Sequence, residues 1–335
     1  MPDVPQLPLA QLYVRTVLSM KDRYGREITY LRLSVTDLCN LRCRYCMPEN
    51  GICKKAHSAM LTEEEMLRAV EAAASLGIRK LRITGGEPLV KPNILSICRR
   101  AASVPGIEEV CLTTNGILLP QFAKPLQEAG VKRLNLSLDT LRPEKYASIT
   151  RCGRLEQALE GLNAALEAGF EKIKINTVLI GGFNDNEIVP LAELTRTYPV
   201  DVRFIELMPI QARDEFEEAA FVPCAKVLEQ LPRAEALGRD GVARLYRLPE
   251  AKGCIGLISP LSDHFCGSCN RLRLTADGTL KPCLHAAAEY SIKGMEKDAM
   301  AEQIRRAIAD KPSCHAELSA VKRSLAGRNM NEIGG

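Results

Sequence analysis

The chain has 335 residues, enough for one large α/β domain or for a domain with an appendage. Hydrophobic residues make up 46% of it, which supports a sizeable core, while the formal net charge of +4 is too small to indicate nucleic-acid binding. No stretch reaches the ~20 apolar residues of a membrane span, so we expect neither a nucleic acid nor a membrane as partner.

The cysteine content indicates the compartment. Thirteen cysteines, an odd count, include CxxC spacings in a chain of the size of a cytosolic enzyme. This pattern favours metal ligation in a reducing compartment over disulfides. Residues 1–20 lack an apolar signal core, so we expect a cytoplasmic protein that begins with a loose leader, residues 1–28.

The first cysteine group follows a strand-like run of alternating residues, 28–35. Cys39, Cys43 and Cys46 stand four and three residues apart, and a tight loop can aim their thiolates at one point. An electron-transfer [4Fe–4S] cluster takes four cysteines, but no fourth falls in register here. A cluster held by three cysteines leaves one iron with an open coordination position, which is typical of a reactive metal site. The alternative is a zinc knuckle completed by a remote His or Cys.

A repeated unit follows the cysteine loop. A capping box over residues 62–65 opens a helix that is predicted to run to residue 76. From 76, 129 and 168 the sequence then repeats a helix end, a glycine cap and an alternating strand, and two further strands fit at 109–113 and 200–206. With the first strand these make six βα units, which right-handed crossovers would wind into a parallel barrel or part of one. The predicted fold class is therefore α/β, a partial (β/α)6 TIM-like barrel over residues 29–210 with a C-terminal cluster-binding extension over 211–335.

One face of these strands is polar. A packed barrel interior could not bury so many unpaired cations and amides, so we expect an open interior that holds an anionic ligand. Ligands in such folds sit at the carboxyl ends of the strands, where the cysteine loop also lies. An antiparallel sheet with one solvent-exposed face is the alternative. The polar residues are Arg32, Ser34, Arg82, Thr84, Asn135, Ser137, Lys174, Asn176 and Arg203.

Short segments at the strand ends complete the predicted site. The glycines of Gly85-Gly86-Glu87-Pro88 would let backbone approach a ligand closely, and the 113–116 turn ends the third strand in the same way. Ser137 and Met208 end the fourth and sixth strands. For a lone methionine, core packing is the ordinary interpretation.

A second cysteine group lies in the C-terminal region. Residues 211–251 are charged and poorly periodic, which predicts a linker with a helix near 224–231. Cys266, Cys269 and Cys283 follow, and a hairpin of 272–275 with 279–281 would return Cys283 to the CxxC pair. A zinc site completed by a further residue is an alternative, with three candidates: Cys254, His264 and His285.

Two arginines favour a substrate site over zinc. Arg271 and Arg273 follow the CxxC directly and would share one face of a strand, where they could bind an anion by forked hydrogen bonds. The remaining cysteines lack partner spacing and are interpreted as small buried hydrophobes: Cys53, Cys98, Cys111, Cys152, Cys224, Cys254 and Cys314.

The combination of CxxxCxxC, TGGEP, TTNG, RFIELM, FCxxCNRLR…CL and a terminal Gly-Gly resembles the GTP 3′,8-cyclase (MoaA) family of radical S-adenosylmethionine (SAM) enzymes. The resemblance implies two [4Fe–4S] clusters, held by Cys39, Cys43 and Cys46 and by Cys266, Cys269 and Cys283. It implies SAM contacts from Tyr45, Gly86, Ser137 and Met208. It implies GTP contacts from Arg32, Arg82, Thr113, Lys174, Arg203, Arg271 and Arg273.

The family's activity is the first step of molybdenum-cofactor biosynthesis. A 5′-deoxyadenosyl radical takes hydrogen from C3′ of GTP, and the C3′ radical attacks C8 to give 3′,8-cyclo-7,8-dihydro-GTP. The resemblance also implies an external one-electron reductant such as a flavodoxin or ferredoxin, and the next pathway enzyme, cyclic pyranopterin monophosphate synthase. It leaves a homodimer open, and it implies that the terminal glycines reach into the active site. Two other readings remain: a radical SAM peptide maturase with an auxiliary cluster, and a non-enzymatic zinc or iron–sulfur module.

Overall fold

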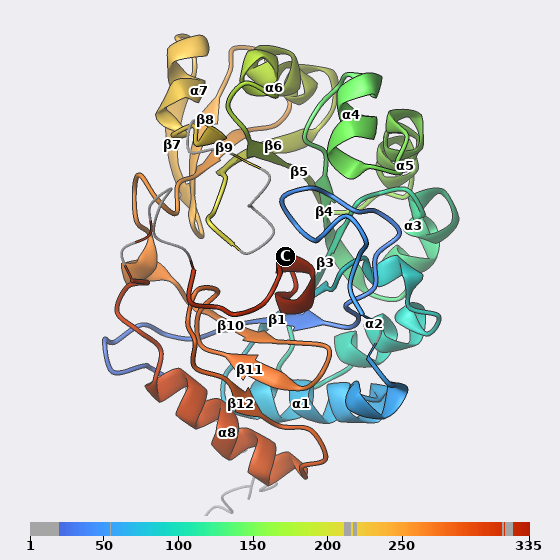
Figure 1. The fold of residues 1–335 in the computed structure, drawn as a ribbon, viewed down its shortest axis with the longest axis vertical. Helices are drawn as coiled ribbons and strands as arrows, with labels where there is room; N and C mark the ends of the chain where they lie inside the picture. The colour runs from blue at the N-terminus through green and yellow to red at the C-terminus, as the bar shows by residue number, and fades with distance from the viewer. Residues whose placement is uncertain (1–19, 54, 211–215, 217–219, 317, 319–323) are drawn as a thin grey trace, which may run out of the picture.

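The computed structural model describes residues 20–53, 55–210, 216, 220–316, 318 and 324–335. Its centre is one sheet with the strand order β12-β11-β10-β1-β2-β3-β4-β5-β6-β9-β8-β7. The strands from β10 through β1–β6 to β9 are parallel, and the outer strands are antiparallel to their neighbours. In the described residues the sheet does not close: it curves around a centre in which the C-terminus lies (Figure 1). This agrees with the predicted α/β fold of partial-barrel type.

The strand bounds confirm the predicted βα units. The six predicted strands are β1 Tyr30–Ser34, β2 Lys80–Thr84, β3 Glu109–Thr114, β4 Val131–Ser137, β5 Lys172–Leu179 and β6 Val200–Glu206. The strands from the C-terminal part are β7 Glu235–Asp240, β8 Ala243–Arg247, β9 Ile255–Ile258, β10 Arg271–Leu274, β11 Thr279–Lys281 and β12 Tyr290–Ser291.

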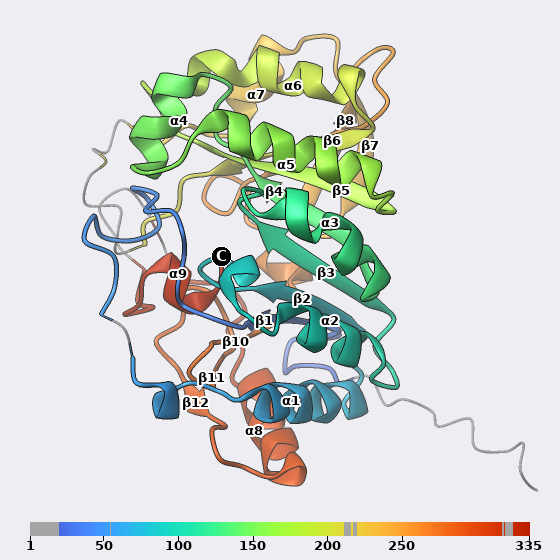
Figure 2. The same ribbon diagram turned by 90° about the vertical axis from the view of Figure 1, so that its right-hand side faces the viewer.

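Helices cover the outer face of the sheet, and Figure 2 shows α1 to α6 side by side on it. They are α1 Glu63–Ser75, α2 Ile94–Ala102, α3 Leu119–Glu128, α4 Pro143–Thr150, α5 Leu155–Glu167 and α6 Ile188–Thr197. The later helices are α7 Ala225–Gln230, α8 Lys297–Ala309 and α9 Met330–Ile333. The predicted capping box of α1 is present, since the Thr62 hydroxyl accepts from the Glu65 amide and the Glu65 side chain accepts from the Thr62 amide. The apolar side chains of these helices and of the strands' outer face form one large core.

The predicted linker is wrong in part. The helix expected near 224–231 is present as α7, but residues 235–247 form the hairpin β7–β8, which extends the sheet beyond β9. Every residue of β7 is exposed, so this edge strand has no buried face and shows no apolar alternation in the sequence. The described residues from 220 onward thus add strands to both ends of the sheet.

The predicted loose leader is also wrong in part. Residues 1–19 lie outside the described residues, but residues 20–28 are tied to the fold. Lys21 bridges to Glu27, and the buried side chains of Arg26 and Asp22 form an ion pair of 2.6 Å. Ile28 is fully buried in the core.

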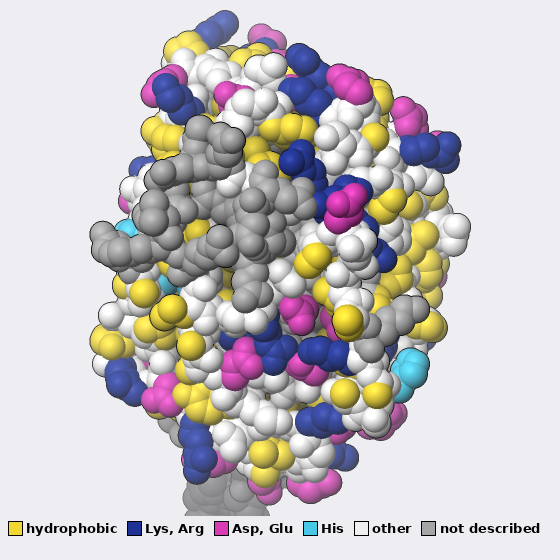
Figure 3. All heavy atoms as spheres, viewed as in Figure 1, with side chains coloured by type: hydrophobic (Ala, Val, Ile, Leu, Met, Phe, Trp, Pro, Cys, Tyr) yellow, Lys and Arg dark blue, Asp and Glu magenta, His cyan; other side chains and the backbone are white. Residues whose placement is uncertain are grey.

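The surface fits the composition. On the face in Figure 3, Lys and Arg side chains are interspersed with Asp and Glu, as the small net charge suggests. None of the helices in the described part of the chain has the length and apolar character that a membrane crossing requires.

Candidate functional site

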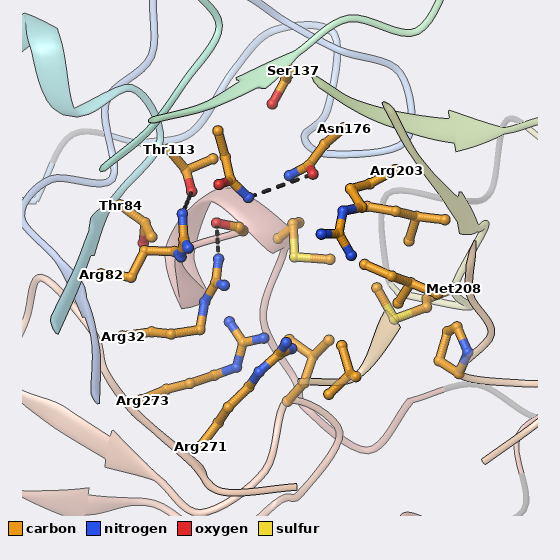
Figure 4. A pocket seen from close by; sticks show the side chains of 18 of the residues that line it. Arg32, Arg82, Thr84, Thr113, Ser137, Asn176, Arg203, Met208, Arg271 and Arg273 are labelled. Atoms are coloured by element: carbon orange, nitrogen blue, oxygen red, sulfur yellow. Dashed lines mark hydrogen bonds between the residues drawn. The ribbon is translucent and has the colours of Figure 1, made fainter. Parts of the chain in front are cut away.

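A cavity of about 510 Å³ lies on the inner face of the sheet, within the range of ligand sites. Every residue predicted to bind a cluster, SAM or GTP lines it, although these residues are spread over the chain from residue 32 to residue 283. Figure 4 shows the arginines entering from one side and Arg203 and Met208 from the other, with Ser137 and Asn176 between them.

The first cysteine group lies in the loop after β1. Burial raises the pKa of the Cys39 thiol to about 11 and that of Cys46 to about 12. The pKa of Cys43 is raised well above its ordinary value by burial and by the neighbouring Cys46. These half-buried thiols therefore resist ionisation, and a metal ion that binds them as thiolates would offset this cost. Three soft sulfur donors on one loop fit an iron–sulfur cluster.

The glycines after β2 hold this loop. A side chain at Gly86 would come within 2.3 Å of the Leu38 carbonyl oxygen, and one at Gly85 within 2.6 Å of that of Thr36. The Gly86 amide donates to Thr36 O at 2.7 Å. Close packing against the cysteine loop thus requires glycine at both positions, and Gly86 also lines the cavity.

A buried carboxylate joins the two turns at the strand ends. Glu87 accepts from the Asn115 amide at 2.7 Å and from the Thr114 hydroxyl at 2.8 Å. Burial nevertheless raises its pKa to about 7. Asn115 in turn donates to the Asn40 side chain at 2.7 Å, inside the cysteine loop. The 85–88 and 113–116 turns therefore position the first cysteine group as well as line the cavity.

Tyr45 is held by a second buried carboxylate. Its hydroxyl donates to Asp139 Oδ2 at 2.7 Å, and the other oxygen of Asp139 accepts from the Val178 amide at 2.8 Å. Burial raises the pKa of Asp139 to about 6. This bond fixes the ring of Tyr45, which lies between Cys43 and Cys46 in the sequence, at the cavity wall.

The sheet register brings four arginines together. Arg32 on β1 is the direct neighbour of Arg82 on β2 and of Arg273 on β10, and Arg271 stands two residues before Arg273. We call Arg32, Arg82, Arg271 and Arg273 the arginine group. Like charges on adjacent strands destabilise a sheet, and no ion pair to a carboxylate involves this group among the described residues.

The arginine group is short of acceptors. Burial and the neighbouring Arg273 lower the pKa of Arg32 well below its ordinary value, and burial and Arg271 lower that of Arg273 to about 10. The buried Nε atoms of Arg32 and Arg271 have no hydrogen-bond partner. Such a group fits a multiply charged anion, which would relieve both the repulsion and the missing bonds.

The cations on the opposite wall are already paired. Lys174 and Arg203 donate to the same Asp240 oxygen at 2.6 and 2.8 Å, and Arg203 also binds Asp201 at 3.0 Å. Although burial opposes it, Lys174 and Arg203 lower the pKa of Asp240. Asp240 stands at the tip of the unpredicted β7–β8 hairpin, so this hairpin closes one side of the cavity.

The predicted hairpin beside the second cysteine group is present. The strands β10 and β11 form the expected hairpin, which returns Cys283 to the wall that holds Cys266 and Cys269. The buried Lys311 donates to the carbonyl oxygens of Arg271 and Pro282 at 2.8 and 2.7 Å. Although burial raises it, the pKa of the Cys269 thiol is lowered overall by Lys311 and Arg271, which favours a thiolate ligand.

The C-terminal residues enter the cavity. The short helix α9 begins at a capping box of Asn329 and Glu332, and Arg328 before it binds Asp277 and Glu289, each at 2.8 Å. The carbonyl oxygens of Gly334 and Gly335 accept from Arg273 and Arg32.

Gly334 has φ 88°, and a side chain there would come within 2.5 Å of the Thr84 hydroxyl. The space around Gly334 therefore accommodates glycine but no larger residue.

Sequence reasoning missed several lining residues. Lys80 stands two residues before Arg82 on the same strand face, so the alternation that identified Arg82 could have found it. Asp139 and Asp240 gave no signal, because single carboxylates in loops and turns are common. The interpretation of the unassigned cysteines as buried holds for Cys98, Cys111, Cys224 and Cys254, but is wrong for Cys53, Cys152 and Cys314, which are exposed.

Comparison with known proteins supports the resemblance. The family model of the radical SAM superfamily matches residues 33–195, and that of Molybdenum Cofactor Synthesis C matches residues 200–317. The GTP 3′,8-cyclase of Alkaliphilus oremlandii is 46% identical over 321 residues, covering 94% of this chain and 100% of that protein. The enzyme of the same name from Pelotomaculum thermopropionicum is 47% identical over 329 residues, with 94% and 100% covered.

Solved structures agree on the fold. Streptococcus suis SuiB is 16% identical with a TM-score of 0.60, covering 86% of this chain and 68% of that one. Methylornithine synthase (PylB) is 17% identical with a TM-score of 0.51, covering 65% and 70%. At these identities the likeness shows a shared fold alone, whereas the near full-length matches above show the family. The chain belongs to the GTP 3′,8-cyclase family of radical SAM enzymes.

Proposed function

We propose that the chain converts GTP to 3′,8-cyclo-7,8-dihydro-GTP, the first step of molybdenum-cofactor biosynthesis. One observation carries this proposal beyond family membership: a single cavity has a three-cysteine group on each of two walls and an unneutralised arginine group beside them. A nucleoside triphosphate has both the charge for the arginines and the base and sugar to reach between the cysteine groups.

The arginine group would hold the triphosphate. Arg32, Arg82 and Arg273 stand side by side on adjacent strands, so their guanidiniums form one basic surface, and Thr113 adds a hydroxyl beside Arg82. Planar guanidiniums bind phosphate oxygens bidentately, which fixes orientation as well as charge. The two buried Nε atoms without partners are the donors left for this purpose.

The wall beside the first cysteine group would hold SAM. Cys39, Cys43 and Cys46 would bind one [4Fe–4S] cluster, with SAM contacted by Tyr45, Gly86, Ser137 and Met208. Cluster and SAM together supply the radical that starts the reaction. The contribution of the protein is position, because the Asp139 bond to Tyr45 and the Glu87 network fix this wall against the arginine group.

The part of the cavity lined by the second cysteine group would hold the guanine base. Cys266, Cys269 and Cys283 would bind the second [4Fe–4S] cluster, with the base against it, so the ribose would be fixed between the two cysteine groups. Lys174 and Arg203 would contact GTP only if the GTP phosphates replace the Asp240 carboxylate as their partner. The Gly-Gly tail, bound to Arg32 and Arg273, would close over the sugar.

The proposed partners follow from this chemistry. Reducing the first cluster needs an external one-electron donor such as a flavodoxin or ferredoxin, and the product would pass to cyclic pyranopterin monophosphate synthase. We place the chain in the cytoplasm, where the thirteen free cysteines would stay reduced. We include a homodimer in the proposal, and the mass of the protein in solution tests it.

The test is anaerobic incubation of the cluster-loaded chain with GTP, SAM and dithionite. We expect 5′-deoxyadenosine and a cyclised nucleotide in equal amounts, with neither product when GTP is replaced by guanosine. If deoxyadenosine forms at the same rate with GTP and guanosine, and no cyclised product appears, the assignment of the arginine group to the triphosphate is wrong.

A further inference from the structure

Beside the second cysteine group lies a set of four metal donors, of which the proposed function uses only one. His264, Cys266, Cys314 and His315 each offer one donor atom, and these atoms all lie within 4.8 Å of one another. Only Cys266 among them belongs to the predicted cluster ligands. The set brings together two of the four histidines of the chain and one exposed cysteine.

The geometry fits one metal ion. Zinc binds sulfur at about 2.3 Å and nitrogen at about 2.0 Å, so donors around one tetrahedral ion lie about 3–4 Å apart. The Nδ1 atom of His264 lies 3.1 Å from Nε2 of His315. Two thiols and two imidazoles make the Cys2His2 donor set of structural zinc sites.

The donors are held in place from outside the set. The buried Arg26, fixed by Asp22, donates to the carbonyl oxygens of Cys266 at 2.7 Å, Ser313 at 3.0 Å and Pro312 at 2.6 Å. One guanidinium therefore fastens the segment before Cys314 to the turn that carries Cys266. This brings together two segments that are far apart in the sequence.

The outer nitrogen of His315 is held as well. Nδ1 lies 2.8 Å from the Ala316 carbonyl oxygen. In the tautomer in which Nδ1–H donates to this oxygen, Nε2 carries a lone pair that can bind a metal beside His264. Backbone partners of this kind orient histidine ligands in metal sites. Nε2 also lies 3.0 Å from the Pro260 carbonyl oxygen, a contact that a bound metal would replace.

We propose that His264, Cys266, Cys314 and His315 bind one Zn²⁺ ion in a form of the protein that lacks the second cluster. Two thiol protons leave to solvent when the ion binds, and no electron is transferred. Because Cys266 is shared, zinc here and the second iron–sulfur cluster exclude each other. The zinc site rests on geometry alone, and only this competition rests on the proposed function.

The decisive protein is the full chain with Cys269→Ala and Cys283→Ala. It cannot assemble the second cluster, but it keeps all four donors and the first cysteine group. Titrated with Co²⁺ under anaerobic conditions, it should take up one ion with the intense visible bands of tetrahedral sulfur–nitrogen coordination. Zn²⁺ should displace the Co²⁺ and bleach the bands.

Two further variants in this background identify the ligands. Cys314→Ser and His264→Gln should each weaken Co²⁺ binding by at least ~10²-fold, since even outer partners of a metal site change affinity by 10–100-fold. Cys152→Ser, a matched change at an exposed cysteine in another loop, should leave it unchanged. Iron retained at the first cysteine group reports folding in every variant.

The competition is tested in the chain with all cysteines present. Zn²⁺ added before reconstitution should block iron uptake at the second group, and Cys314→Ser should remove this block. Tetrahedral Co²⁺ binding that survives both Cys314→Ser and His264→Gln, or is absent from the starting variant, overturns the site. These readouts do not depend on cyclase activity, so failure of the proposed function leaves them intact.

Discussion

Arg32→Met should make the ligand-free protein more stable while it weakens GTP binding. The change removes the central charge of the arginine group and keeps an unbranched side chain of similar length. In the folded chain the pKa of Arg32 is lowered by burial and by the charge of Arg273. A base whose folded pKa is lowered destabilises the fold at every pH below that value, so the penalty applies at neutral pH.

The magnitude follows from the sheet register. Arg32 has a charged neighbour on each side, Arg82 and Arg273. If the side-chain charges are taken to be about 8 Å apart, with an effective dielectric constant of about 20, each repulsion is about 2 kcal/mol. The variant loses the hydrogen bond to the Gly335 carbonyl and some packing, which costs about 1–2 kcal/mol of this gain. The net gain is about 2 kcal/mol, or about 4 °C in Tm.

The assay compares Tm with and without GTP in the cluster-loaded chain and measures the Kd of GTP by calorimetry. We expect a higher Tm without GTP, and a GTP affinity at least about tenfold lower, because removing one charged partner of a bound anion costs about 2–5 kcal/mol. Arg133→Met is the matched control: its arginine is paired with Glu109 at 3.0 Å, so the variant should not gain stability and should bind GTP normally. A lower Tm for ligand-free Arg32→Met together with unchanged GTP affinity would show that Arg32 is structural.

Three further predictions test other parts of the site. Cys283→Ala should lose about half of the iron while some SAM cleavage persists, and iron falling to zero or staying constant would contradict two separate clusters. Gly334→Ala, which meets the Thr84 hydroxyl, should lower cyclisation by about 10²-fold with both clusters and GTP affinity retained; a full rate would show that the tail is a frayed end. The pKa of Asp277 is lowered: burial opposes this, but bonds to Lys55, Thr275 and Arg328 outweigh it. Its stabilisation is present above its ordinary pKa of about 4 and lost as pH falls through the lower folded value. Asp277→Asn should therefore flatten the acid side of the Tm–pH curve, and an unchanged curve would contradict the anchoring of the tail by this carboxylate.

Local sequence determined the secondary structure and the donor sets. The glycine after each helix and the alternation of the following strand are properties of a few neighbouring residues, so β1 to β6 could be predicted with bounds within about three residues. The same holds for the spacing of each cysteine group and for the β10–β11 hairpin with its Asp-Gly turn. The polar strand face indicated an anion site because charges that alternate with apolar residues must all point to one side of the sheet.

Tertiary structure alone decided what these elements face. Every residue of β7 is exposed, so nothing in the sequence of this strand revealed that it joins the sheet and places Asp240 against Lys174 and Arg203. The arginine group exists only because β10 pairs with β1 in a register that sets Arg273 beside Arg32. Likewise, Cys314 meets Cys266 through the hydrogen bonds of Arg26. Contacts between segments so far apart depend on how all the strands assemble into one curved sheet, which no local pattern specifies.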